Sequence, residues 1–207
     1  CIRDRRLAGD LITSGTTRVC MFSSLHTEAT WILMDELERA GVTGYVGKVN
    51  MDRNGLPGVL EETTEESIRE TVRWLDGCHF EHVRPIITPR FTPSCTDELM
   101  AALGKLARER ELYIQSHLSE NTREIEWVRE LHPDCKQYWE TYDKYGLWKD
   151  FLEAGFRAVV RPELLLVGNV VWNRVIGLSC GAFLSCVGEN THLCVSARSK
   201  KRLILVV

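Results

Sequence analysis

Segments with strand character and segments with helix character alternate at a steady interval along the first three-quarters of the chain. The strand-like segments are short and rich in apolar or β-branched residues, and the helix-like segments carry apolar residues three or four positions apart. The expected strands are 16–22, 43–51, 83–91 and 112–118, and the expected helices are 27–41, 64–75, 94–110 and 121–132. Such a series of β-α units predicts parallel strands joined by crossover helices.

Two folds contain such units, the doubly wound sheet and the (β/α)8 barrel. No G-x-G-x-x-G follows any of the strands, so nothing favours a dinucleotide site. We therefore expect an α/β fold that forms a partial (β/α)8 TIM-type barrel of about four β-α units, with an irregularity at the prolines of 83–91. In that fold functional residues stand at the carboxyl ends of the strands, where Arg90 and His117 both lie.

The alternation breaks after about residue 148. Residues 149–207 are rich in valine, leucine and cysteine and have few clear helix caps, so they are interpreted as a divergent C-terminal tail beside a partial barrel over residues 1–148. The chain opens at Cys1 in what reads as the inside of a helix. This pattern indicates a fragment.

Composition excludes several functions. A net charge of -3 without a large basic cluster argues against nucleic-acid binding. The sequence has 8 cysteines, and no two of them form a C-x-x-C motif. This spacing argues against a zinc ribbon or a thioredoxin-type site and fits reduced thiols. No signal peptide opens the chain and no apolar run is long enough to span a membrane, so we expect a cytoplasmic protein without a membrane partner.

The stretch "ELYIQSHLSEN" (111–121) places a histidine near the carboxyl end of a strand, with a carboxylate three residues later. Tyr113, Gln115 and His117 should share one face of that strand. His117 and Glu120 suit a metal ligand beside a proton-transfer group, and they equally suit an ordinary histidine and a helix-capping acid. Of the other histidines, only His26 is expected near the functional end.

Arg90 and Phe91 close the strand before it. A guanidinium in this place suits an anionic or carbonyl-bearing ligand through its planar fork, or a surface ion pair. The phenylalanine suits stacking on a flat ring, or filling of the core. Their common position at the strand ends favours a ligand site.

Several motifs together resemble the guanine deaminases, zinc enzymes of the amidohydrolase superfamily. They are "VGKVNMD" (46–52), "EETTEESIRET" (61–71), "ITPRF" (87–91), "IQSHLSEN" (114–121) and "TYDKYGLW" (141–148). The resemblance implies a (β/α)8 barrel, usually a homodimer, that hydrolyses guanine to xanthine and ammonia. It also implies that His117 is a Zn2+ ligand near the substrate, that Glu120 is the catalytic proton shuttle in contact with the purine, and that Arg90 and Phe91 bind the purine.

The chain departs from the family pattern in its other metal ligands. The H-x-H of the first barrel strand, the histidine of the fifth and the aspartate of the eighth are absent. A single imidazole does not hold zinc, so we expect that this chain alone does not turn over guanine. The alternatives are a non-catalytic half-barrel interaction protein, for instance one that pairs with a full-length subunit, and a related zinc amidohydrolase acting on another ring. The T-P-R-F motif favours guanine.

Overall fold

The structure is a computed structural model that describes residues 2–56, 62–148, 168–172, 195–199 and 202–206. Its helices are α1 (Ile2–Thr13), α2 (Thr27–Arg39), α3 (Thr64–Asp76), α4 (Asp97–Glu109), α5 (Thr122–Leu131) and α6 (Glu140–Asp143), with a 3₁₀ turn η1 (Thr92–Ser94). Its strands are β1 (Arg18–Phe22), β2 (Thr43–Gly47), β3 (Val49–Asn50), β4 (Val83–Pro85), β5 (Thr88–Pro89), β6 (Ile114–Leu118), β7 (Gly168–Trp172), β8 (Val195–Ser199) and β9 (Arg202–Val206).

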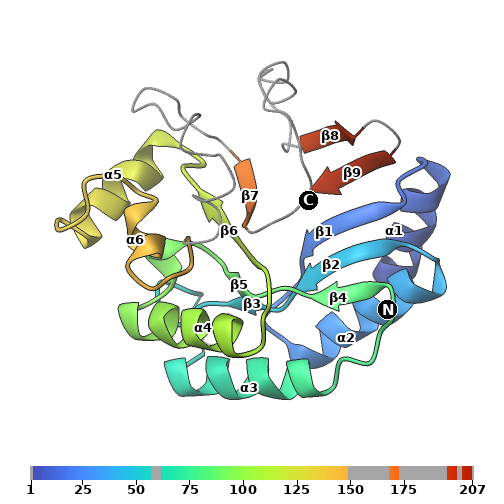
Figure 1. Ribbon diagram of the computed structural model, residues 1–207, viewed down its shortest axis with the longest axis horizontal. Coiled ribbons are helices and arrows are strands. Elements are labelled where there is room, and N and C mark those ends of the chain that lie inside the picture. The colour runs from blue at the N-terminus through green and yellow to red at the C-terminus, as the bar shows by residue number, and fades with distance from the viewer. Residues whose placement is uncertain (1, 57–61, 149–167, 173–194, 200–201, 207) are drawn as a thin grey trace.

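The strands from β1 to β6 stand side by side in chain order and run parallel. β1 pairs with β2, β2 with β4, and β3 with β5. The next neighbour is β6, since the backbone N–H of Ile87 donates to the carbonyl of Tyr113 at 2.9 Å, and that of Gln115 to the carbonyl of Ile87 at 2.9 Å. Helices α1 to α4 lie along the outside of this curved wall of strands (Figure 1). The predicted parallel β-α arrangement is confirmed.

Two of the expected strands are interrupted. The segment 43–51 divides into β2 and β3 at Lys48, and the segment 83–91 divides into β4 and β5 at Ile86 and Ile87. Pro85 and Pro89 close β4 and β5, and neither has an N–H to donate to a neighbouring strand. The irregularity that the prolines predicted is present.

Side-chain caps fix where the helices begin, and so where the loops after the strands end. Thr96 caps α4 by accepting the N–H of Leu99 at 3.2 Å. Thr63 caps α3 in a capping box with Glu66. Asn121 caps α5, so the loop between β6 and that helix is only three residues long, Ser119 to Asn121.

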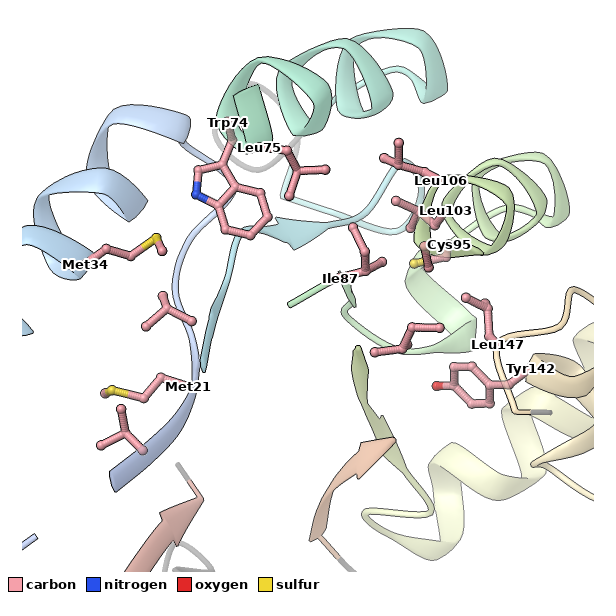
Figure 2. Packing of buried hydrophobic residues seen from close by; sticks show 14 of the residues in the cluster. Met21, Met34, Trp74, Leu75, Ile87, Cys95, Leu103, Leu106, Tyr142 and Leu147 are labelled. Atoms are coloured by element: carbon pink, nitrogen blue, oxygen red, sulfur yellow. The ribbon is translucent and has the colours of Figure 1, made fainter. Parts of the chain in front are cut away.

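The hydrophobic core lies between the strands and the outer helices. Figure 2 shows Met34, Trp74 and Leu103 from three successive helices facing Ile87 of the wall. Each of these four side chains is fully buried. This packing makes the wall rigid, which positions the residues at its carboxyl edge.

The predicted tail of residues 149–207 lies mostly outside the described residues, and its treatment as a separate unit stays a prediction. Three short strands in it are described; β7 and β9 pair with the two edges of the wall, and β8 pairs with β9. β9 runs parallel to β1 and antiparallel to β8, and β7 runs antiparallel to β6. Because β7 runs antiparallel to β6, it does not continue the series of parallel β-α units. Among the described residues no helix is long and apolar enough to cross a membrane.

Candidate functional site

The carboxyl ends of the parallel strands lie at one edge of the wall, and their side chains alternate between its two faces. The rings of Phe22 (β1) and His117 (β6) contact each other, with centroids 4.4 Å apart. One layer below, the thiol of Cys20 donates to Gln115 Oε1 at 3.1 Å. Because β1 and β6 are not neighbours in the wall, these contacts cross its concave side. His117 and Gln115 therefore point to the inside, on one face as expected.

His117 is half-buried and held by one carbonyl group. Its backbone N–H donates to the carbonyl oxygen of Arg90 at 3.1 Å, and its Nδ1 lies 2.8 Å from the same oxygen. A carbonyl only accepts, so Nδ1 carries the proton and Nε2 of the neutral ring offers a lone pair. Burial lowers the pKa of His117, the nearby charge of Arg90 acts in the same direction, and the bond to the carbonyl and the charge of Glu120 oppose it. The net effect favours the neutral imidazole that a metal requires.

Arg90 and Phe91 form a flat, partly exposed surface beside this histidine. The guanidinium carbon of Arg90 lies 5.2 Å from the centroid of the Phe91 ring, and its Nη1 lies 3.7 Å from the sulfur of Met51. The edge of Phe91 meets Trp127 of α5 at a centroid distance of 6.3 Å. A cation with several N–H donors beside an aromatic face can bind a planar ring that carries acceptors.

Glu120 is exposed in the loop between β6 and α5. Ser119, just before it, has φ 55°, a left-handed conformation that turns the chain sharply at the end of the strand. The charge of Glu120 acts on the imidazole of His117, so the two groups lie within electrostatic range. The backbone N–H of Glu124 donates to Asn121 Oδ1 at 3.0 Å, and its carboxylate accepts the hydroxyl of Tyr138 at 2.7 Å. The loop that carries Glu120 is thus anchored.

The expected site residues lie together, and the structure adds others that the sequence pattern missed. Ser116 and Tyr142 are fully buried behind the site, and Trp127, at 37% exposure, stands at its rim. Tyr142 belongs to the segment "TYDKYGLW", whose similarity to the family was the one available signal.

A catalytic zinc ion takes three or more protein ligands with one position left open. Within the described residues no group of three His, Cys, Asp or Glu side chains can hold a metal. His26 is exposed at the start of α2, and the buried His132 lies 3.7 Å from Asp97, in another loop region. The described residues therefore supply one prepared ligand, His117 Nε2, and do not fit a complete zinc centre.

The chain has the architecture of part of a (β/α)8 barrel, with parallel strands inside, helices outside, and titratable and aromatic groups at the carboxyl ends of the strands. Residues 5–160 match the sequence profile of the Amidohydrolase family, and the chain belongs to this family.

Relatives of known activity agree with that assignment. The chain is 44% identical over 145 residues to the guanine deaminase of Mus musculus, covering 69% of this chain and 32% of the relative. The guanine deaminase of Escherichia coli is 34% identical over 139 residues, covering 66% of this chain and 31% of the relative. The chain thus spans about a third of the length of the curated relatives it matches.

Solved structures give the same result for the fold. Guanine deaminase from C. acetobutylicum, with guanine bound in its active site, has a TM-score of 0.65 and 48% identity over 69% of this chain and 34% of that one. A triazine hydrolase from Arthrobacter aurescens, 18% identical, has a TM-score of 0.59 over 70% of this chain and 34% of that one, which supports the fold alone. The predicted partial barrel is confirmed.

Proposed function

We propose that this chain is the purine-recognition and proton-transfer part of a guanine deaminase active site, where guanine and water become xanthine and ammonia. The observation that carries the proposal is that His117 is held on the backbone carbonyl of Arg90, whose guanidinium lies over the ring of Phe91, at the carboxyl edge of the wall. The identity of 44–48% to guanine deaminases supports it.

Guanine is a flat ring with acceptors on its carbonyl and imidazole edges. The guanidinium of Arg90 has several N–H donors in one plane, and Phe91 offers the face on which such a ring stacks. The backbone carbonyl of Arg90 binds His117, so we expect a purine bound by Arg90 and Phe91 to have its reactive carbon close to the imidazole and the loop carboxylate.

Replacement of the exocyclic amine by water needs a group that moves protons. A proton must leave the attacking water, and protons must reach the ring nitrogen and the departing ammonia. Glu120, on an anchored loop within electrostatic range of His117, is the carboxylate that we assign to this transfer. His117 is assigned as one Zn2+ ligand, and the remaining ligands must come from outside the described residues.

Binding of guanine by the full chain of 207 residues tests the proposal. Equilibrium dialysis with radiolabelled guanine should show saturable binding, and Arg90→Ala should weaken it by about tenfold because a charge-assisted contact is lost. Arg84→Ala is the matched control, since Arg84 is an exposed arginine near the other end of the same barrel strand. It should change the affinity by less than about twofold.

Ammonia release with added zinc is a second measurement. We expect none from this chain, because one imidazole does not retain the ion. Zinc-dependent release would show that the rest of the chain completes the ligand set. Absence of guanine binding would refute the proposed function and favour the non-catalytic half-barrel, which would pair with a full-length subunit. Tighter binding of another ring would favour a related amidohydrolase.

We place the protein in the cytoplasm, with homodimer formation as in the family and without a nucleic-acid partner.

A further inference from the structure

Behind the site, a buried tyrosine hydroxyl joins the two segments that carry the site residues. Tyr142 of α6 is fully buried, and its hydroxyl lies 2.7 Å from the carbonyl oxygen of His117. The hydroxyl oxygen of Tyr142 also lies 3.2 Å from the backbone N of Thr92 and 2.9 Å from Ser116 Oγ. A phenol donates one hydrogen bond and accepts two. Tyr142 therefore donates to His117 and accepts from Thr92 and Ser116.

These bonds fix the distance between the end of β6 and the loop after β5. That loop contains Arg90 and Phe91, and Thr92 is the next residue along the chain. A neighbouring hydroxyl pair, Thr92 Oγ1 and Thr141 Oγ1 at 2.7 Å, joins the same loop to α6. The Phe91 ring, which we assign to purine binding, and the imidazole of His117 are thus both held from behind by the short helix α6.

The packing around Tyr142 gives this anchor a rigid base. Its ring stacks on that of Tyr138, with centroids 6.0 Å apart and planes 13° from parallel. Figure 2 shows the ring beside Leu147, which is 2% exposed, with the hydroxyl oxygen directed away from its own helix. A side chain confined in this way presents its hydroxyl in one place.

We propose that Tyr142 is a positioning residue for purine recognition: its hydroxyl keeps Arg90, Phe91 and His117 in register without touching the ligand. The inference rests on the proposed function, since the residues held in register are those assigned to guanine. It predicts that removing one oxygen atom behind the site weakens binding at the front.

The test is Tyr142→Phe in the full chain, which keeps the ring and removes the hydroxyl. We expect a folded protein by far-UV circular dichroism and a guanine affinity lower by about tenfold in equilibrium dialysis. The control is Tyr145→Phe, because Tyr145 lies in the same segment and its hydroxyl faces the charge of Asp97. That variant should bind guanine within about twofold of the unchanged chain. Equal affinity of the Tyr142→Phe variant and the unchanged chain would overturn the proposal.

A spectroscopic readout separates positioning from a general loss of stability. Long-range ¹H–¹⁵N correlation spectra, with the His117 signal assigned from its absence in His117→Gln, report which ring nitrogen carries the proton. The unchanged chain should show the Nδ1–H form that the bond to Arg90 O requires. Tyr142→Phe should shift His117 toward a mixture of both forms, and Tyr145→Phe should not. An unshifted signal in Tyr142→Phe would contradict the proposal.

The two readouts also distinguish this inference from the proposed function. If no variant binds guanine and the His117 signal still shifts in Tyr142→Phe, the positioning role stands and the guanine assignment fails. If Tyr142→Phe does not fold, Ser116→Ala replaces it, since that change removes a hydrogen bond to the Tyr142 hydroxyl itself. A Ser116→Ala variant with full guanine affinity and an unshifted His117 signal would then refute the inference.

Discussion

Replacement of Gly47 by alanine should destabilise the chain, because the wall leaves no space for a β-carbon there. Gly47 is the last residue of β2. An ideal Cβ on it would lie 1.7 Å from Thr88 Oγ1, 2.7 Å from the carbonyl oxygen of Ile86 and 2.8 Å from Gln115 Nε2. All three distances are too short for real contacts, so neighbouring groups must move.

Two contributions set the size of the effect. Forcing a methyl group into a packed interior costs about 1–3 kcal/mol. The displaced Gln115 amide donates to Thr88 Oγ1 and to the carbonyl of Met21, each at 2.9 Å. Losing one such buried bond costs about 1 kcal/mol more. Gly47→Ala should therefore lower the free energy of unfolding by about 2–4 kcal/mol, a large part of the stability of a typical domain.

Urea unfolding followed by far-UV circular dichroism measures this difference. The control is Gly9→Ala, because Gly9 lies within α1 and a Cβ on it would meet nothing within 4 Å. That substitution should raise the stability by about 0.5–1 kcal/mol through helix propensity. Thr88→Ala added to Gly47→Ala should recover part of the loss, since it removes the nearest atom. A Gly47→Ala variant within about 0.5 kcal/mol of the unchanged chain would refute the reasoning.

Three further predictions concern the ion pair of His82 with Glu38, the carboxylate of Asp52, and two buried thiols. His82→Ala should lower stability at pH 5.5 and have less effect at pH 8.5. The bond to the Glu38 carboxylate raises the pKa of His82, and a raised pKa gives stability that is lost as the pH rises through it; urea midpoints at both pH values measure this. Asp52→Ala should cost about 2–3 kcal/mol in urea unfolding, since this carboxylate accepts one backbone N–H and two threonine hydroxyls at the starts of two helices. Cys20 and Cys95, whose pKa burial raises to about 12, should stay unmodified by iodoacetamide at pH 8 while the chain is folded, as peptide mass spectrometry would show.

The fold could be predicted to a large extent because its signals are local. Apolar spacing of two or of three to four residues indicated the strands and helices, and polar residues such as Thr96 of α4 cap the helices where the apolar spacing begins. The helix expected over 64–75 is α3, and its cap is Thr63, because the Thr63 hydroxyl and the Glu66 carboxylate satisfy each other's backbone N–H groups.

Only some residues of the candidate site could be predicted from the sequence. The places of Arg90 and His117 at strand ends follow from the order of β-α units, and the motif resemblance assigned their roles together with those of Phe91 and Glu120. Tyr142 carries no such local signal. Its function as an anchor depends on three bonds to residues 25 to 50 positions away in the chain.

The sequence by itself determined the alternation of strands and helices, the parallel order of the wall and the strand ends at which reactive groups stand, because each depends on side chains close together in the chain. Tertiary structure alone decided which of them meet. The contact of Phe22 with His117, and the bond between Cys20 and Gln115 across 95 positions, exist because the wall curves and brings its first and fourth strands face to face. Curvature arises from the packing of helices on one side of the strands, and no short stretch of sequence encodes it.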